Sequence, residues 1–478
     1  MKKRSVMWVI LCLLLVLTFF PKAALGAEAG EDTDMSVTNG SHSIEAQSSL
    51  LGNKQLIENA ESVILYDIAS DTMIYSWNPD QQINPGSFTK IMTLWIVAEE
   101  GKLSDVVEVS GEVIATISKD AVSMDLKASE ILTMEDLVYG MMVGSANDAA
   151  AVIADHMAGS QAAFADKMNQ YAQKAGCTNT NFVNAHGLQA ENQYTTPRDV
   201  TRIIAAASQN QVFREIFGEV YYRMEDEQGN ATRVMNTSNK LLDAESVYYD
   251  SRIIGSRTSA SSDGKRSVAS LAKEGNLEVI SIITGSANKY EADGYTERTP
   301  GAYPETKQLL DLGLTGYKRV QVIYEGQVFK QVPVVNGDSD VLLGSNIAVS
   351  TVLPQAVSDG QLTYQYLEVS DQITAPVEKG QVLSKVQIWY QDVCLAEAQL
   401  CAMNAVPFMQ SKIVHTQEKS LTNTLKYVIP VLIALILLVI IIRSGIPGAI
   451  YRRIRRKIRG VSAQKRSRRN RMNRRRSR

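Results

Sequence analysis

Cysteine and histidine are scarce in this chain of 478 residues, which contains four of each. Four cysteines are too few for a disulfide scaffold, and the chain has no C-x-x-C pair of the kind found in zinc and redox sites. The histidines show no spacing typical of metal ligands; they are His42, His156, His186 and His415. A Gly-rich phosphate loop is also missing. We therefore expect no metal and no organic cofactor.

Apolar and charged residues occur in ordinary amounts. The chain is 45% hydrophobic and 21% charged, which excludes collagen-like, mucin-like and wholly disordered proteins. Its length indicates about three domains of ~150 residues. The net charge of −2 hides a segregation, because residues 443–478 hold 16 Lys/Arg and no Asp/Glu, and the rest of the chain carries 33 basic against 51 acidic residues.

A secretory signal peptide is expected at residues 1–26. Basic residues at positions 2–4 precede an apolar run from Val6 to Phe20, and Ala24 and Gly26 place small residues before a cleavage point. An uncleaved signal anchor is the alternative. The polar, Ser/Thr/Gly-rich segment that follows, 27–54, is typical of a linker.

A transmembrane helix is expected at residues 425–442. The run YVIPVLIALILLVIII rises ~24 Å as a helix against a ~30 Å hydrocarbon core, so Lys426 and Arg443 would reach toward the interfaces. The alternative, a buried core helix, has no apolar sequence after it to pack against. Because basic segments stay in the cytoplasm, the tail 443–478 predicts a single-pass C-terminal anchor in the cell membrane with the rest of the mature chain outside.

The basic tail also affects which binding partners we expect for this protein. Its Lys/Arg residues could contact anionic lipid heads or nucleic acid, but its low complexity favours a solvated tail that stops transfer. We expect contact with membrane lipid through the helix and tail, and no nucleic acid.

Two folded domains are expected between the linker and the anchor. Residues 55–317 alternate helical and strand-like patterns and predict an α+β domain. Residues 318–406 contain short, β-rich runs separated by turns and predict a small all-β domain, followed by a second linker, 407–424. The predicted strands are 62–67, 73–77, 268–271, 277–284, 320–324, 328–334, 341–343, 362–367, 382–389 and 393–400; the predicted helices are a buried one that opens at Ser87, 132–142, 148–157, 162–175 and one beginning at 196–199.

Ser87 and Lys90 place a hydroxyl and an amine three residues apart. Positions i and i+3 share a helix face, so the amine can reach the hydroxyl. Serine needs an adjacent base to act as a nucleophile, and a lysine desolvated in an apolar helix can lose its proton and serve as that base. The Ser-x-x-Lys pattern alone is weak, because it occurs by chance in most chains of this size.

Ser145 and Asn147 form a second element, 58 residues further on, in a polar gap between two apolar helices. A hydroxyl and an amide there suit proton relay and contact with a substrate carbonyl. The alternative is a helix cap, since Ser and Asn are both good caps.

With these elements the chain resembles the low-molecular-weight penicillin-binding proteins, the serine D-alanyl-D-alanine carboxypeptidases. Residues 84–93 (NPGSFTKIMT) look like the family's P-A-S-x-T-K-I-M-T, and 132–150 (LTMEDLVYGMMVGSANDAA) look like its L-T-x-x-D-L-L-x-x-x-L-x-x-S-x-N-D-A. Residues 181–188, 194–199 and 373–383 are similar to its N-F-x-N-x-x-G-L, Y-S-T-A-x-D and A-P-V-x-K-G-Q segments. The resemblance covers roughly residues 55–406 and implies a β-lactamase/transpeptidase-like domain followed by a β-sandwich-like one.

The family's third motif, G-x-K-T-G-x-T, falls on residues 255–261, which read GSRTSAS. Arg257 replaces lysine and keeps the charge with a different shape. Ser259 replaces a glycine whose lack of a side chain permits close approach to the strand, so it could narrow the cleft. Thr258 is retained. The resemblance also implies that the backbone N–H groups of Ser87 and Ala260 form the oxyanion hole, and we interpret His186, in an HGL turn, as structural.

The resemblance implies a D,D-carboxypeptidase acting on peptidoglycan stem peptides, with β-lactam antibiotics as covalent inhibitors. Lys90 would deprotonate Ser87, which attacks the penultimate D-Ala carbonyl; D-Ala leaves, protonated through Ser145 or Lys90, and water hydrolyses the acyl-enzyme. Asn147 would hold the peptide, and Arg257 and Thr258 its carboxylate. A catalytically impaired homologue that acts as a scaffold is the alternative, supported by the altered third motif. A β-lactamase is a weaker one, because the anchor and second domain fit a wall-modifying enzyme better.

Overall fold

The structure of the protein is a computed structural model that describes residues 50–52, 54–226, 228–290, 297–367, 372–409 and 416–443, together with residue 455. The predicted signal peptide lies outside these residues, as do most of the first predicted linker and, apart from Arg443 and Arg455, the basic tail. The chain divides into a larger unit that ends at Val406 and a smaller unit that consists of residues 336–338 and the chain from Pro407 on.

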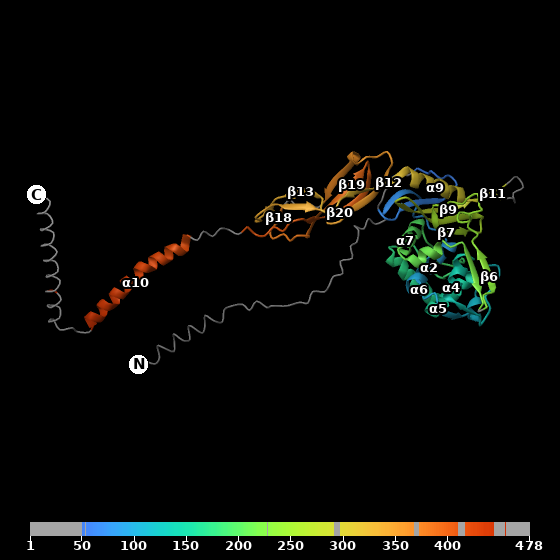
Figure 1. The fold of residues 1–478 in the computed structure, drawn as a ribbon, viewed down its shortest axis with the longest axis horizontal. Helices are drawn as coiled ribbons and strands as arrows, with labels where there is room; N and C mark the ends of the chain where they lie inside the picture. The colour runs from blue at the N-terminus through green and yellow to red at the C-terminus, as the bar shows by residue number, and fades with distance from the viewer. Residues whose placement is uncertain are drawn as a thin grey trace. The chain divides into compact units, whose positions relative to one another are not determined.

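A five-stranded antiparallel sheet of order β2-β1-β9-β8-β7 lies at the centre of the first domain (Figure 1). The two N-terminal strands predicted from the sequence are confirmed and pair as a hairpin, and β8 and β9 extend beyond the predicted strands. β7, which carries the altered third motif, is at an edge of this sheet. The bounds are β1 Ser62–Asp67, β2 Thr72–Trp77, β7 Ile253–Ala260, β8 Lys265–Glu274 and β9 Leu277–Ala287.

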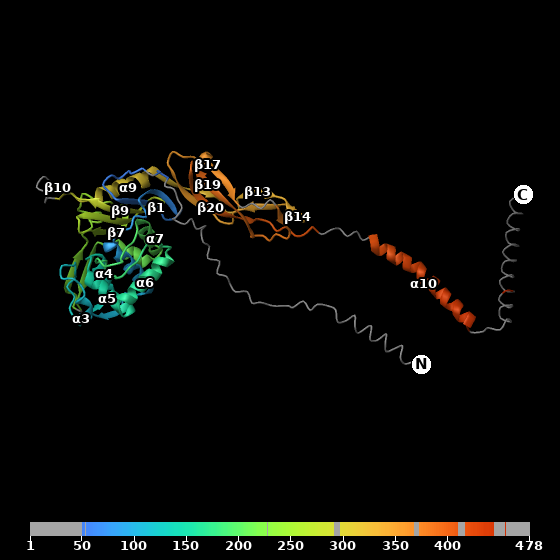
Figure 2. The same cartoon turned by 180° about the vertical axis from the view of Figure 1, so that it is seen from behind.

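Both faces of the sheet are covered. Side chains alternate along a strand, so Ile64 and Tyr66 of β1 pack into a core with the helices α2 to α8, while Val63 and Leu65 pack into a second core with α9. Figures 1 and 2 show α9 on the opposite side of the sheet from α4, α5 and α6. On the helical side, η1 and α8 pack against β7, where the candidate site lies.

The predicted helices are confirmed, with local capping that explains their starts. Thr133 and Asp136 form a capping box at α4, and Thr196 caps α7 ahead of Pro197. The sequence did not predict α3, α8, α9, β3, β4 or the β5–β6 hairpin, and residues 118–130 contain no regular element. The bounds are η1 Gly86–Phe88, α2 Thr89–Glu100, β3 Val106–Glu108, α3 Gly111–Ile114, β4 Ile131–Thr133, α4 Met134–Met142, α5 Asn147–Ala158, α6 Gln161–Lys174, α7 Pro197–Ala207, α8 Gln211–Phe217, β5 Tyr221–Glu225, β6 Ala231–Asn236, β10 Lys289–Tyr290, β11 Glu297–Thr299 and α9 Tyr303–Gly316.

The second domain is all-β, as the sequence predicts. A five-stranded sheet of order β13-β15-β20-β19-β17 encloses its own core, and β12 pairs with β16. Asp67 accepts from Arg319 at 2.7 Å, which joins the two domains. The strand bounds are β12 Tyr317–Ile323, β13 Val328–Val332, β14 Val334–Val335, β15 Val341–Gly344, β16 Val349–Pro354, β17 Leu362–Leu367, β18 Ile373–Thr374, β19 Val382–Tyr390 and β20 Val393–Ala402, and the 3-10 turn η2 spans Asp359–Gln361.

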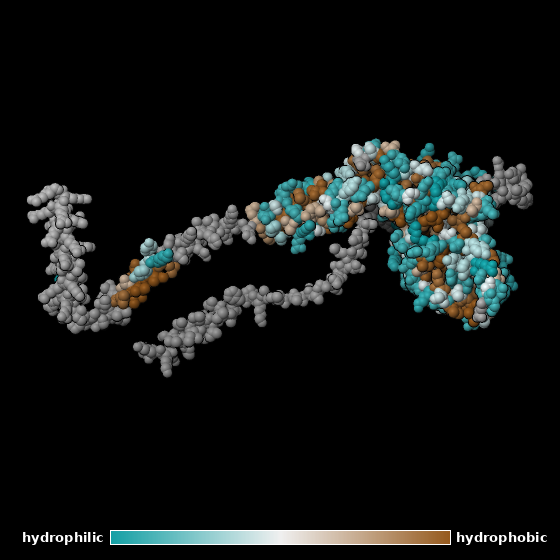
Figure 3. Space-filling view, viewed as in Figure 1, coloured by the Kyte–Doolittle hydropathy of each residue, from teal (hydrophilic) through white to brown (hydrophobic). Residues whose placement is uncertain are grey.

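The smaller unit contains the helix α10, Thr416–Arg443, which includes the residues predicted to form the anchor. Hydrophobic residues cover much of its drawn surface (Figure 3). Among the described residues, no helix has the combination of length and hydropathy needed to cross a membrane.

Candidate active site

The first and second predicted elements come together where η1, α2 and the α4–α5 connection meet. Ser87 is the middle residue of η1 and is half-buried, and Lys90 lies in the first turn of α2. The residues from Thr89 to Val97 are all buried, as the apolar sequence predicts. The Lys90 side chain is only 1% exposed and crosses to α5, so an amine on an apolar helix is enclosed in the domain core.

Lys90 is held by two oxygen acceptors. Its Nζ donates to Asn147 Oδ1 at 2.7 Å and to the His186 main-chain oxygen at 2.6 Å. Burial lowers the pKa of the Lys90 amine well below its usual range, and the charge of Arg257 lowers it further. A neutral amine has two N–H groups and one lone pair, so both N–H groups can be used by these acceptors while the lone pair stays available.

The Ser87 hydroxyl has no hydrogen-bond partner among the described residues. It precedes Lys90 by three residues of right-handed helical backbone, which puts both on one side of the chain. The described contacts of Lys90 Nζ are to Asn147 and His186 and not to the Ser87 hydroxyl, which the fold leaves unused and therefore available for attack on a substrate.

Ser145 and Arg257 form a second direct contact. Arg257 Nη2 donates to Ser145 Oγ at 2.6 Å, and Nη1 donates to the Met142 oxygen at 2.7 Å. Arg257 is 6% exposed, and burial lowers the pKa of its guanidinium to about 10. Because Ser145 Oγ accepts from Arg257, its own proton remains free to be donated elsewhere.

The helix-cap alternative for Ser145 and Asn147 is wrong. Ala146 is the N-cap residue of α5, without a side-chain cap, and Asn147 is the first helical residue. Ser145 instead has a left-handed φ of 60°, a conformation that is uncommon for a residue with a Cβ and is often found at functional sites. Asn147 uses its amide to join Lys90 to Val122, whose oxygen accepts from Asn147 Nδ2 at 2.8 Å.

Thr258 and Ala260 lie on β7 but on the other side of the strand from Arg257 and Ser259, by the alternation of strand side chains. Thr258 is half-buried and Ala260 is exposed. The structure therefore brings Ser87, Lys90, Ser145, Asn147 and Arg257 into one polar cluster, and places Thr258 and the Ala260 backbone at its border.

The main-chain N–H of Ser87, one of the two predicted oxyanion donors, is already in use. It donates to the side-chain hydroxyl of Ser259 at 3.1 Å. The sequence indicates that a side chain at position 259 could narrow the cleft. In the structure the Ser259 side chain does more than occupy space, because it accepts a hydrogen bond from the Ser87 N–H, a predicted oxyanion donor.

Asp148 is a positioning residue that sequence reasoning missed. It is 3% exposed and accepts from Met124 N at 3.1 Å, Leu126 N at 3.1 Å and Ser123 Oγ at 2.6 Å. These bonds hold the irregular chain that directly follows Val122 and so keep the Val122 oxygen beside Asn147. The sequence did contain a signal for this role, because Asp148 comes directly after Ser145-Ala146-Asn147.

The NFVNAHGL segment supplies an oxygen rather than a catalytic side chain. His186 Nδ1 accepts from Leu188 N at 3.1 Å, and burial, with a smaller effect of Lys90, lowers the pKa of its imidazole to about 4. These contacts agree with the structural interpretation of its side chain. The contribution to the site is the His186 main-chain oxygen, which composition could not reveal.

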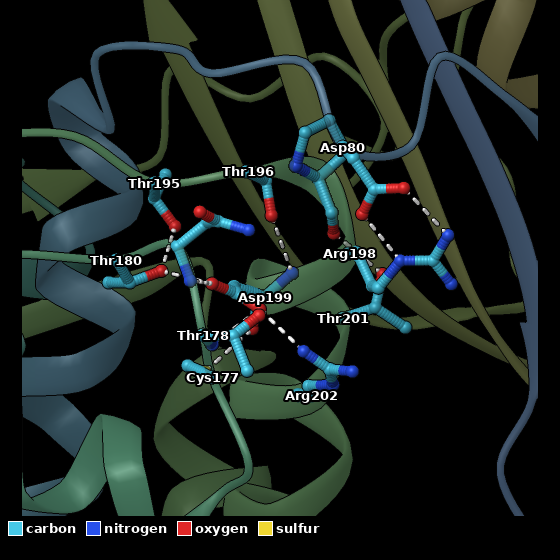
Figure 4. A network of polar contacts seen from close by, with 12 residues as sticks. Asp80, Cys177, Thr178, Thr180, Thr195, Thr196, Arg198, Asp199, Thr201 and Arg202 are labelled. Atoms are coloured by element: carbon cyan, nitrogen blue, oxygen red, sulfur yellow. Dashed lines mark hydrogen bonds and ion pairs between the residues drawn. The ribbon is translucent and has the colours of Figure 1, made fainter. Parts of the chain in front are cut away.

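Asp199, of the YTTPRD segment, anchors the chain that leads into this turn (Figure 4). It is 1% exposed and accepts from Asn179 N and Thr180 Oγ1, both at 2.8 Å, and from Arg202 Nη1 at 2.8 Å. Nearby, Arg198 pairs with Asp80 through two bonds of 2.6 and 2.9 Å. The network thus fixes α7 to the start of the segment that carries His186.

Within the described ranges, no group of three or more His, Cys, Asp or Glu residues is placed to hold a metal ion. Cys177, Cys394 and Cys401 are free thiols.

Comparison with known proteins agrees with this cluster. The family model for D-alanyl-D-alanine carboxypeptidases matches residues 52–288, and that for the C-terminal domain of penicillin-binding protein 5 matches residues 317–407. The D-alanyl-D-alanine carboxypeptidase DacC of Escherichia coli is 30% identical over 358 residues, which cover 73% of this chain and 84% of the relative. DacF of Bacillus subtilis is 24% identical over 353 residues, covering 73% of this chain and 86% of DacF.

Among solved structures, penicillin-binding protein 5 from Haemophilus influenzae superimposes with a TM-score of 0.61 at 27% identity, covering 73% of this chain and 98% of that one. The fold is thus that of a penicillin-binding protein with an α+β domain and a C-terminal all-β domain. The chain belongs to the serine D-alanyl-D-alanine carboxypeptidase family.

Proposed function

We propose that Ser87 and Lys90 are the nucleophile and general base of this D-alanyl-D-alanine carboxypeptidase. The observation that carries the proposal is the environment of Lys90. Its amine is buried, its pKa is lowered, and two fixed oxygens accept its two N–H groups. The remaining lone pair is the base that a serine hydroxyl three residues away requires.

The reaction then follows with all protons accounted for. Ser87 Oγ attacks the carbonyl carbon of the penultimate D-Ala, and its proton passes to Lys90 Nζ. The C–N bond breaks, and the leaving amine of the terminal D-Ala takes a proton from Lys90, directly or through Ser145, whose Oγ is held by Arg257. Water next attacks the ester, gives its proton to Lys90, and the proton returns to Ser87 Oγ as the acyl group leaves.

Peptidoglycan stem peptides are the substrate class that this chemistry fits. The substrate ends in a carboxylate, and Arg257 and Thr258 on β7 are the groups proposed to attract it, with Asn147 holding the peptide. A β-lactam presents a strained amide beside a carboxylate, so it would acylate Ser87 through the same steps, with the proton going to the ring nitrogen.

Weakened catalysis is a second candidate, favoured by one observation. The Ser87 N–H that should bind the oxyanion is occupied by the Ser259 hydroxyl. A homologue whose oxyanion hole stays closed would bind wall peptides without turning them over.

We also propose that the enzyme is exported and anchored by a single C-terminal segment. Support comes from the apolar run 427–442 within α10, from the 16 basic and no acidic residues in 443–478, and from the signal-like residues 1–26. The two domains proposed for the outside are 55–317 and 318–406, connected to the anchor by 407–424.

The function is tested by covalent labelling with a fluorescent penicillin and by D-Ala release from a peptide ending in D-Ala-D-Ala. A stoichiometric adduct on Ser87 together with D-Ala release supports the proposal. Peptide binding with neither an adduct nor D-Ala release supports the weakened homologue, because a closed oxyanion hole prevents acylation. An adduct on a residue other than Ser87 would reject the assigned nucleophile.

A further inference from the structure

The Ser259 side chain lies against the corner of the chain that carries the nucleophile. Its Oγ accepts from Ser87 N at 3.1 Å, across 172 residues of sequence. A Cβ added to Gly86 would lie 2.3 Å from the same Oγ. The hydroxyl therefore fits between β7 and η1 only because residue 86 has no side chain.

Two departures from the family pattern are thus complementary. The pattern that residues 84–93 resemble has alanine at position 86, where this chain has glycine, and the third motif has glycine at position 259, where this chain has serine. The alanine methyl and the serine hydroxyl would collide. The exchange of both residues keeps the contact filled but replaces an apolar methyl on η1 with a polar hydroxyl on β7.

The position of this hydroxyl matters because of the donor it uses. An oxyanion-hole donor lies about 2.7–3.1 Å from the oxygen that it stabilises, and Ser259 Oγ is at such a distance from Ser87 N. A main-chain N–H has one hydrogen. The Ser259 hydroxyl and a substrate carbonyl oxygen therefore compete for it.

We propose that Ser259 gates the oxyanion hole: its hydroxyl occupies the hole in the free enzyme and rotates away when a substrate carbonyl enters. The proposal rests on the proposed function, which makes Ser87 N an oxyanion donor. Rotation about χ1 gives Oγ other staggered positions, and Ser259 is only half-buried on an edge strand, so the movement needs no rearrangement of the sheet. Ser259 is a positioning residue, because it acts through the Ser87 N–H.

The gate affects one half of the reaction. Acylation starts from the closed hole and must exchange one hydrogen bond for another. Deacylation starts from an acyl-enzyme whose ester oxygen already occupies the hole, so Ser259 has moved before that step. Removal of the hydroxyl should therefore speed acylation and leave deacylation unchanged.

The test compares four variants of the full chain with the wild type: Ser259→Ala, Ser259→Gly, Ser267→Ala and Ser87→Ala. Ser259→Ala removes only the hydroxyl, and we expect its second-order acylation rate with fluorescent penicillin to rise about two- to tenfold, the effect of one net hydrogen bond. Ser259→Gly should be at least as fast. Ser267 pairs with Ser259 across β7 and β8, and Ser267→Ala should match the wild type.

Deacylation is followed by release of the label, and its rate should be the same in the wild type and Ser259→Ala. An unchanged or lower acylation rate in Ser259→Ala overturns the gate, as does a gain in Ser259→Gly that Ser259→Ala does not share, because that gain belongs to the Cβ. Equal gains in acylation and deacylation also overturn it. If neither the wild type nor the Ser259 variants label at Ser87, with Ser87→Ala as the reference, the proposed function has failed and the gate with it.

A second measurement uses the complementary pair. Gly86→Ala should slow acylation in both backgrounds, because a φ of 49° strains any residue with a Cβ, but the loss should be larger in the wild type, where the methyl also meets Ser259 Oγ, than in a Ser259→Gly background. Equal losses in the two backgrounds would show that the residues are independent, contrary to the proposal.

Discussion

Gly187 lies directly against the main chain of Gly86, so that a Cβ at Gly187 would be 1.8 Å from the Gly86 carbonyl oxygen. Gly187 also has a left-handed φ of 85°. Its neighbour His186 supplies an oxygen to Lys90, and Gly86 precedes Ser87. The HGL turn therefore holds two parts of the site together. These are Gly86, which precedes the nucleophile, and the His186 oxygen, which accepts from Lys90.

Gly187→Ala should damage both stability and acylation. A left-handed φ alone costs about 1–2 kcal/mol for a residue with a Cβ, and the overlap with Gly86 must be relieved by moving η1. We expect penicillin labelling to slow by more than tenfold. Gly159→Ala is the matched control, because Gly159 has a φ of 76° with nothing within 4 Å of an added Cβ. Equal stability and labelling in the two variants would contradict the close contact.

Ser87→Ala should abolish covalent labelling and leave thermal unfolding nearly unchanged. The Ser87 hydroxyl has no partner among the described residues, so its loss removes no folded-state hydrogen bond. Ser110→Ala is the comparison: Ser110 caps α3, remote from the chemistry, and its variant should keep full labelling while losing about 1 kcal/mol of stability. Persistent stoichiometric labelling of Ser87→Ala would show that another residue is the nucleophile.

Asp199→Asn should destabilise the domain by about 3 kcal/mol, measured by urea unfolding. The side chains of Asp199 and Arg202 are 1% and 5% exposed, and the asparagine amide keeps one acceptor oxygen in place of the two carboxylate oxygens that accept from Asn179 N, Thr180 Oγ1 and Arg202 Nη1. Asp80→Asn removes a partner of Arg198, but the Asp80 side chain is 58% exposed, so this control should cost at most about 1 kcal/mol. A similar loss in both variants would mean that the Asp199 network does not hold the turn.

Local patterns predicted local structure well. The helices predicted at 132–142 and from 196–199 are both present, and each is capped by a threonine that bonds a residue three positions further on, Thr133 to Asp136 and Thr196 to Asp199. The role of Ser145 and Asn147 was open, since cap and relay residues look alike in sequence. Arg257 bonds to Ser145 and Ser259 bonds to Ser87, in both cases across more than a hundred positions, and these residues meet only because β7 packs against η1 and the α4–α5 connection. The His186 oxygen is a main-chain atom, so its contact with Lys90 could not be predicted from the residue type.

The anchor is tested by truncation. A chain ending at Lys412 lacks the apolar run and should remain soluble after cell lysis, whereas the full chain should sediment with membranes. Deletion of residues 425–442 alone, with the basic tail kept, separates insertion from charge attraction and should also be soluble. Protease cleavage of the tail from outside intact cells would contradict the proposed orientation.

The pH dependence of acylation should report Lys90 and its neighbour Arg257. The base must be neutral, so kcat/KM falls as pH drops through the pKa of Lys90 in the free enzyme. The Arg257 cation disfavours a second positive charge and contributes to the lowered pKa of that amine. Arg257→Gln removes the cation, so the pKa of Lys90 rises, the amine stays protonated to higher pH, and the acid limb should shift upward. Arg257→Lys keeps a cation and should shift the acid limb less, even if the labelling rate of this variant differs.

Labelling rates measured from neutral to alkaline pH locate the acid limb in the wild type and in each variant. An acid limb that stays in place in Arg257→Gln, or moves to lower pH, would mean that the titrating group is not the Lys90 amine beside Arg257.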